Sequence, residues 1–207
     1  MYRQMSSFTG AALLVVDVQN DFCAGGALAV PRGDRVVEPI NRLLAAYAAA
    51  DAAVFASRDW HPTGTSHFID RGGQWPVHCV ADTPGAAFHP RLTLPDGTAV
   101  VSKGQVPDSD GYSAFDGTLS AGETLEAALR ERNVGHLTVC GLATDYCVRA
   151  SVLDARARNL TVAVVREAIA AVNLKPGDET AALDDMCAAG ADIVALDDAL
   201  ALVGAGA

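Results

Sequence analysis

The 207-residue sequence lacks the features that mark membrane, secreted and nucleic-acid-binding proteins. Its longest apolar run covers residues 43–50, well short of the roughly 20 residues that cross a bilayer. The first nine residues have no basic segment followed by a long apolar stretch, so we expect no secretory signal. Positive charge is scarce, because 15 Lys and Arg stand against 25 Asp and Glu. The net charge of −10 argues against nucleic-acid or anionic-membrane partners.

Cysteine occurs at only five positions, an odd number without regular spacing. This usage is typical of reduced thiols and predicts a cytoplasmic protein. The sequence also has no internal repeat, linker or low-complexity segment, so we expect one domain over residues 1–207. Neither a G-x-G-x-x-G pattern nor a Walker-type lysine loop is present, which leaves nucleotide or flavin binding without support.

Half of the residues are hydrophobic, and short Val-rich runs alternate with helical patterns. We predict six strands, at residues 11–16, 52–56, 99–102, 136–140, 161–165 and 192–196. We predict helices at residues 34–50, 122–132, 145–158 and 178–189, with Asp34 and Asp178 as N-caps and Gly190 as a stop. The strands lack strict alternation, as strands buried on both faces do. The fold class is therefore a three-layer α/β/α domain with a six-stranded, mainly parallel sheet.

One stretch, residues 60–95, interrupts this rhythm with abundant Gly, Pro, His and Trp. A loop of that length inside a compact domain is usually functional.

Polar residues follow several predicted strands at the point where each strand ends. Asp17, Asp59 and Lys103 follow the first three strands, and the fourth strand runs into the segment that holds Cys147. Ligands of open α/β sheets bind outside the carboxyl ends of the strands, near the point where the strand order reverses. We therefore expect these four side chains to share one mouth of the fold.

Cys147 is the candidate nucleophile of this group. We expect it in the first turn of a helix, where free N–H groups and the helix dipole lower a thiol pKa. Asp17 is the candidate base, and Lys103 beside both anions would tune their pKa values. Each residue alone has an ordinary alternative: a buried small thiol, a loop carboxylate or a surface charge. Their convergence from separate strand ends favours catalysis.

A second group of residues has the chemistry of metal ligands. Asp59 and His61 follow the second strand, and His67 and His78 lie in the long loop. Carboxylate and imidazole ligands suit Zn²⁺, Fe²⁺ or Mn²⁺, and an open site uses three or four of them. Loop histidines are often ordinary polar residues, but three of the five histidines fall in this one segment. We therefore predict one divalent metal ion.

These residues lie in motifs that resemble the isochorismatase-like cysteine hydrolases, and within that family the nicotinamidases and pyrazinamidases. The motifs are residues 16–22 (VDVQNDF), 59–62 (DWHP), 75–80 (WPVHCV), 103–104 (KG), 112–115 (YSAF) and 141–148 (GLATDYCV). The first and last are typical of the whole family. The two metal motifs separate nicotinamidases from relatives that work without a metal.

The resemblance implies roles for individual residues. It implies a catalytic triad of Asp17, Lys103 and Cys147, and metal ligands at Asp59, His61 and His78, with His67 as a fourth ligand found in some members. It also implies that Phe22, Trp75 and Tyr112 sandwich a pyridine ring next to Leu142. Finally, it implies a cis Leu142–Ala143 peptide bond and an oxyanion hole made of the N–H groups of Ala143 and Cys147.

The activity that the resemblance implies is hydrolysis of nicotinamide, and of pyrazinamide, to the acid and ammonia through a Cys147 thioester, in pyridine nucleotide salvage. A homo-oligomer is compatible with this activity. One alternative is another amidohydrolase of the same family, with a carbamoyl or ureido substrate. A second is a non-catalytic metal- or ligand-binding scaffold, against which the intact triad argues. The stretch 105–111 is longer than in the shortest nicotinamidases and bears on the position of Tyr112.

Overall fold

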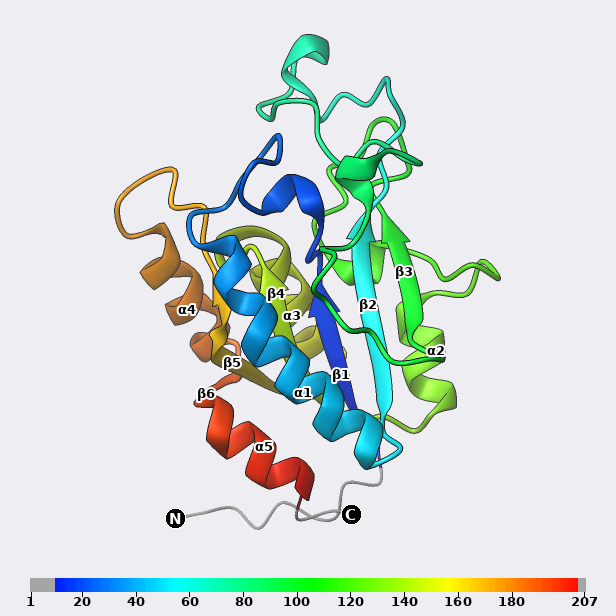
Figure 1. Cartoon of the computed structure of the whole chain (residues 1–207), viewed down its shortest axis with the longest axis vertical. Helices are drawn as coiled ribbons and strands as arrows, with labels where there is room; N and C mark the ends of the chain where they lie inside the picture. The colour runs from blue at the N-terminus through cyan, green and yellow to red at the C-terminus, as the bar shows by residue number, and fades with distance from the viewer. Residues whose placement is uncertain (1–9, 205–207) are drawn as a thin grey trace.

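The computed structural model describes residues 10–204 as a β-sheet between two layers of helices (Figure 1). The strands are β1 (Ala11–Val16), β2 (Ala53–Asp59), β3 (Ala99–Lys103), β4 (His136–Leu142), β5 (Thr161–Ala170) and β6 (Asp192–Val194). The helices are α1 (Val37–Ala49), α2 (Leu125–Glu131), α3 (Arg149–Ala157), α4 (Asp178–Ala188) and α5 (Leu196–Gly204). The predicted three-layer α/β/α class is confirmed.

The six strands form one sheet in the order β3-β2-β1-β4-β5-β6. Every pairing between these strands is parallel, so the sheet goes beyond the mainly parallel arrangement predicted. The strand order reverses at β1 and β4, whose connections leave toward opposite edges of the sheet. A crevice opens at such a reversal, outside the carboxyl ends of the strands.

Helices cover both faces of the sheet, which explains why β1 is buried along its whole length. Leu13 and Val15 pack in one core cluster with residues of α1 and α5, such as Leu43. Leu14 and Val16 face the opposite cluster, with residues of α2, α3 and α4. Figure 1 shows α1 and α5 in front of the sheet. Successive side chains of the strand therefore point alternately into the two buried cores, so every position of the strand is apolar.

The first predicted strand matches β1 at both ends, whereas β2 and β5 extend beyond their predicted carboxyl ends to Asp59 and Ala170. The last predicted strand, 192–196, stops at Val194, because Leu196 begins the unpredicted helix α5. Helix α1 begins at Val37 rather than at residue 34, after a 3₁₀ turn.

The two predicted N-caps are wrong. Asp34 lies inside the 3₁₀ turn, and its carboxylate accepts the Ala24 N–H at 2.9 Å. Asp178 is the first residue of α4, and its carboxylate accepts the Lys175 N–H at 2.8 Å. Both carboxylates satisfy loop donors instead of helix donors. Gly190 ends α4 as predicted, since its φ of +89° is in the left-handed region that terminates helices.

Gly141 brings β4 close to β1 at the reversal of the strand order. Its φ is +118°, and a Cβ there would lie 2.0 Å from the carbonyl oxygen of Val16. The pairing of β4 with β5 shifts its register between Val139 and Gly141. A side chain at this position would separate the two strands whose ends flank the crevice.

The long loop predicted to be functional lies above the carboxyl ends of β1 and β2 (Figure 1). It contains two 3₁₀ turns, Ile69–Arg71 and Pro84–Ala86. An isolated bridge between Gln19 and Phe88 joins the loop to the segment after β1, and a bridge between His61 and Val80 pairs two parts of the loop itself. Among residues 10–204, no helix is long and apolar enough to cross a membrane.

Candidate active site

A narrow pocket with a cavity volume of about 30 Å³ lies where the loops meet the carboxyl ends of the strands. Its lining combines thiol, imidazole, carboxylate and aromatic groups. The lining residues are Phe22, Leu28, Val30, Asp59, His67, Trp75, His78, Tyr112, Ala143, Tyr146, Cys147 and Val172. Small-molecule sites have this character: mostly apolar walls with a few convergent polar groups.

Asp17 directly follows β1 and is completely buried. Its backbone adopts a φ of +48°, an uncommon conformation for a residue with a side chain. Ser57 of the neighbouring strand β2 makes two hydrogen bonds with it: the Asp17 N–H donates to the Ser57 carbonyl at 3.1 Å, and the Ser57 hydroxyl donates to Asp17 Oδ1 at 2.7 Å. Asp17 is therefore fixed, with Oδ2 left for other partners.

Lys103 ends β3, and its buried ammonium group reaches the other predicted catalytic residues. Its Nζ lies 2.9 Å from Asp17 Oδ2, 2.5 Å from Asp59 Oδ1 and 3.4 Å from Cys147 Sγ. It also donates to the Gly111 carbonyl at 3.0 Å. We call Asp17, Lys103 and Cys147 the strand-end cluster.

Opposing effects set the charges of the strand-end cluster. Burial lowers the pKa of Lys103, but the two adjacent carboxylates raise it more, so its pKa lies well above the usual value. Burial raises the pKa of Asp17, with Lys103 acting in the opposite direction. An ammonium group between carboxylates is thus held in its charged form.

The expected lowering of the Cys147 pKa is wrong. Burial raises the pKa of this thiol well above its usual value, and Lys103 opposes this shift less than burial and the carboxylates drive it. The neighbouring carboxylates of Asp17 and Asp59 also raise the pKa of the thiol, because their negative charge disfavours the thiolate. A helix terminus lowers the pKa of a thiol, whereas the degree of burial, which dominates here, is not visible in the sequence. A resting thiol beside a carboxylate needs that carboxylate as its base.

Cys147 lies in a five-residue π-helical turn, Thr144–Val148, rather than in the first turn of α3. The N–H groups of Tyr146 and Val148 both donate to the Ala143 carbonyl, at 3.1 Å each. The Leu142–Ala143 peptide bond is cis, as the resemblance implied. This turn leads from β4 to α3 and presents the thiol at the pocket wall.

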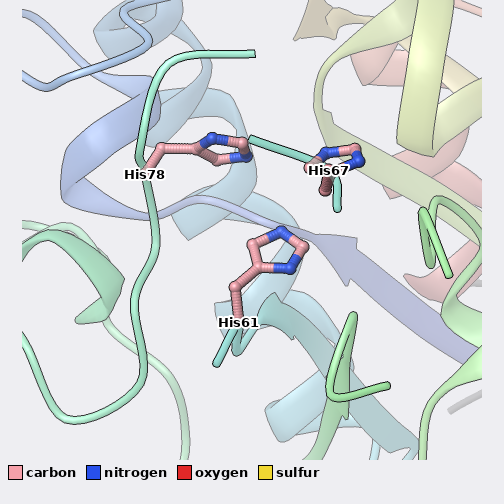
Figure 2. A group of neighbouring side chains, drawn as sticks. All are labelled: His61, His67 and His78. Atoms are coloured by element: carbon pink, nitrogen blue, oxygen red, sulfur yellow. The ribbon is translucent and has the colours of Figure 1, made fainter. Parts of the chain in front are cut away.

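Three histidines of the long loop converge on one point, and we call His61, His67 and His78 the histidine cluster. Figure 2 shows their rings facing a common space. One nitrogen of each lies within 4.8 Å of the others, and all three side chains are buried. The rings of His61 and His67 stack with centroids 4.9 Å apart.

Each of the three rings uses its Nδ1 atom on an acceptor of the protein. The acceptors are the Gly104 carbonyl for His61 at 3.0 Å, Asp110 Oδ1 for His67 at 2.9 Å and the Pro76 carbonyl for His78 at 2.7 Å. These contacts place a proton on Nδ1 and a lone pair on Nε2. Within residues 10–204, His61 Nε2 is buried without a hydrogen-bond partner. Such an orphaned nitrogen fits a metal ligand.

Asp59 joins the two clusters. Its Oδ1 faces Lys103, while its Oδ2 lies 3.6 Å from His61 Nε2 and 3.9 Å from His78 Nε2. Burial opposes ionisation of Asp59, but Lys103 and then His61 lower its pKa below the usual value. Burial lowers the pKa of His78 to about 4 and also lowers that of His67. Imidazoles and one carboxylate are a donor set that suits a divalent transition metal.

Aromatic side chains form the remaining walls. Phe22 packs against His78 with ring centroids 5.5 Å apart, and the Trp75 indole N–H donates to the Tyr112 hydroxyl at 2.8 Å. Tyr146 stands edge-on to Trp75 at 4.9 Å. Leu142 is buried in the core beside the pocket and is not among the lining residues.

Four residues with evident positions in this site were not singled out from the sequence: Gln19, Ser57, Asp110 and Tyr146. Gln19 binds the backbone of Asp59 through its side-chain oxygen and nitrogen, each at 2.8 Å. Gln19 and Tyr146 lie inside motifs recognised in the sequence, so position within a motif could have indicated them. Ser57 and Asp110 carry no comparable signal, since their contacts depend on strand pairing and on a loop path.

Comparison with known proteins agrees with this geometry. Residues 11–198 match the isochorismatase domain family. A nicotinamidase of Escherichia coli is 42% identical over 203 residues, covering 90% of this chain and 95% of the relative. A nicotinamidase/pyrazinamidase of Mycobacterium tuberculosis is 41% identical over 187 residues, covering 88% and 97%. The chain therefore belongs to the isochorismatase family.

A solved structure supports the likeness in three dimensions. The pyrazinamidase of Pyrococcus horikoshii, crystallised in complex with zinc, superimposes with a TM-score of 0.82 at 42% identity. The match covers 89% of this chain and 98% of that one. The fold and the family resemblance found in the sequence are thus confirmed, while the roles of individual residues stay predictions.

Proposed function

We propose that this protein is a nicotinamidase, which hydrolyses nicotinamide, and also pyrazinamide, to the corresponding acid and ammonia. The observation that carries the proposal is that Cys147 lines one pocket together with two residues of the histidine cluster. Lys103 Nζ contacts this cysteine and also Asp17, the proposed base. The relatives of known activity cover nearly the whole chain. The reaction would serve pyridine nucleotide salvage.

The first step is proton transfer from the Cys147 thiol to Asp17, because a carboxylate oxygen of Asp17 lies within 4.8 Å of the sulfur. The resulting thiolate is stabilised by Lys103 Nζ, 3.4 Å from the sulfur. The thiolate attacks the carboxamide carbon, and the carbonyl oxygen becomes an oxyanion. The N–H groups of Ala143 and Cys147 are the proposed donors to that oxyanion, each worth about 3–4 kcal/mol when well aimed.

The second step breaks the carbon–nitrogen bond. Asp17 returns its proton to the departing nitrogen, ammonia leaves, and the acyl group stays on Cys147 as a thioester. Water then attacks the thioester and gives one proton to Asp17. The carbon–sulfur bond breaks, the thiolate recovers that proton, and the acid product ionises. Lys103 stays charged throughout, because the carboxylates hold its pKa high.

A divalent metal held by Asp59, His61, His67 and His78 would supply Lewis-acid chemistry, toward a ring nitrogen or toward water. Zn²⁺, Fe²⁺ and Mn²⁺ all suit this donor set. Phe22 and Trp75 are the proposed walls for the ring, with Tyr112 positioned by its bond to Trp75.

Three further expectations belong to this proposal. The chain acts as one domain, since its six strands form a single sheet. A cytoplasmic location is supported by five free cysteines. A homo-oligomeric state is compatible with the reaction and is tested by the mass of the purified protein in solution.

The test is ammonia release from nicotinamide, pyrazinamide and a ureido compound, with and without added zinc. We expect turnover of the two aromatic amides, and loss of roughly 10⁴-fold or more in the Cys147→Ala variant. The matched control is Cys187→Ala, because Cys187 is exposed on α4 and should leave the rate unchanged.

Two results would overturn the proposal. Activity retained by Cys147→Ala would exclude this cysteine as the nucleophile. Turnover of the ureido compound without turnover of nicotinamide would assign a different amidohydrolase activity to the same triad.

A further inference from the structure

The segment between Lys103 and Tyr112 is bound to the histidine cluster at several points. The Gly104 carbonyl accepts from His61 Nδ1 at 3.0 Å, and Asp110 accepts from His67 Nδ1 at 2.9 Å. Two of the three histidines are thus oriented by one loop that follows β3.

The same loop fixes the chain just before His67. The Pro107 carbonyl accepts from the Ser66 N–H at 2.8 Å and from the Thr65 and Ser66 hydroxyls at 3.0 Å each. Three donors on one carbonyl hold the backbone of residues 65–66 against the loop. The position of the His67 backbone therefore follows the position of residues 105–111.

Asp110 has a different kind of contact from the other two Nδ1 partners. His61 and His78 are oriented by backbone carbonyls, whereas His67 is oriented by a side chain that is 66% exposed. A carboxylate only accepts, so His67 must carry its proton on Nδ1 and its lone pair on Nε2. Without Asp110, nothing in this contact would distinguish the two tautomers or the two ring orientations of His67.

We propose that Asp110 is a positioning residue of the metal site: it holds His67 so that Nε2 faces His61 and His78 as a metal ligand. The inference rests on the proposed function, because it assigns the metal to the same site. Residues 105–111 then determine whether two or three histidines of the cluster bind the ion. Carboxylates that orient metal-bound imidazoles in this way typically change metal affinity by about 10–100-fold.

The experiment measures the zinc dissociation constant of the full chain by competition with a chromophoric chelator. We expect Asp110→Ala to weaken zinc binding by about 10–100-fold. The matched control is Asp108→Ala, which removes the same charge from an exposed position of the same loop and should leave the affinity unchanged. Asp110→Asn keeps an acceptor oxygen, so it should lower the zinc affinity less than Asp110→Ala does.

Two further measurements separate positioning from a general effect on the fold. In the His67→Ala background, Asp110→Ala should cause no additional loss of affinity, because its effect passes through that ring. In the metal-free protein, ¹⁵N shifts of His67 should report an Nδ1–H tautomer in the unsubstituted chain and a tautomer mixture in Asp110→Ala. Both readouts are independent of catalysis.

The inference would be overturned if Asp110→Ala bound zinc as tightly as the unsubstituted chain. It would also be overturned if Asp110→Ala reduced the zinc affinity by the same factor in the His67→Ala variant as in the unsubstituted chain. Absence of zinc binding by the unsubstituted chain would overturn it as well. The zinc measurement uses no substrate, so it is independent of the test of the proposed function. If the variants show the expected zinc affinities but the unsubstituted chain does not hydrolyse nicotinamide, the nicotinamidase activity is refuted and the role of Asp110 stands.

Discussion

The strand-end cluster and the histidine cluster share one pocket and meet at Asp59, yet they are built in different ways. Asp17 and Lys103 lie at strand ends, and Cys147 lies in the turn that follows β4. The histidines come from a long loop and are oriented by hydrogen bonds to Gly104, Asp110 and Pro76.

The two clusters also differ in charge. The strand-end cluster contains a buried cation, the Lys103 ammonium, which lies 2.9 Å from Asp17 and 2.5 Å from Asp59. In the histidine cluster, burial lowers the pKa of His67 and His78, so these rings are neutral near pH 7. A buried ion destabilises the folded state when its partner is removed. Neutral imidazole rings add to the stability of the folded state only when they bind a ligand such as a metal ion. The comparison thus predicts that substitutions in the strand-end cluster change the stability of the metal-free protein, whereas substitutions in the histidine cluster change its response to metal.

Lys103→Met should have the largest effect. It leaves Asp17 and Asp59 buried as two carboxylates without their shared cation. Removing one partner from a buried ion pair costs about 3–5 kcal/mol. We therefore expect the free energy of unfolding in urea to fall by about that amount at neutral pH, with loss of ammonia release.

Lys175→Met is the matched control, since Lys175 is exposed and its loss should change the free energy of unfolding little. Equal stabilities of the Lys103 and Lys175 variants would contradict the view that the strand-end cluster is held by compensating charges.

The histidine cluster should respond to metal instead. Zinc at about 100 times its dissociation constant stabilises a protein by about 2.7 kcal/mol. For a chain of this size that corresponds to a rise in the melting temperature of roughly 5–10 °C. His78→Ala should abolish most of this rise, because it removes one of three converging nitrogens. Chelation should return the unsubstituted protein to the lower melting temperature and reduce its activity.

His136→Ala is the control for this measurement. His136 begins β4, at the opposite end of the strand from the pocket, and contacts Thr138. Its substitution should leave the zinc-dependent rise unchanged. A full rise in His78→Ala would remove the histidine cluster as the metal site.

The parts of the molecule that follow from strand periodicity could be predicted from the sequence. The run Ala11–Val16 is apolar at every position, and the structure buries it between two helical layers. The convergence of Asp17, Lys103 and Cys147 also follows, because parallel strands bring their carboxyl ends to one edge. Helix α5 was missed because the apolar run 193–196 continues from β6 into the first residue of the helix, so the predicted strand covered the boundary between them.

The parts that depend on burial and on loop path could not be predicted. The direction of the Cys147 pKa is one example, because burial outweighs the turn that presents the thiol. Asp34 is another: a nearby loop donor, the Ala24 N–H, replaces the expected helix donor. The partner of His67 depends on where residues 105–111 run, and a single sequence contains no signal for that path.

Gly104→Ala should lower stability less than Lys103→Met does, and it should act selectively on the histidine cluster. Gly104 has a φ of +67°, and a Cβ there would lie 2.4 Å from Cε1 and 2.6 Å from Nδ1 of His61. Gly97 provides the matched control, since its φ is +82° but a Cβ there would meet nothing within 4 Å. In both variants, the left-handed backbone conformation by itself should lower the free energy of unfolding by about 1–2 kcal/mol.

Only Gly104→Ala should also weaken zinc binding, because the added methyl group displaces the His61 ring from its bond to the Gly104 carbonyl. The zinc dissociation constants of the two variants provide the measurement. If they are equal, the close approach of the backbone to His61 has no part in shaping the metal site. If they differ, the histidine cluster depends on the shape of its surrounding loops, as the strand-end cluster depends on charge.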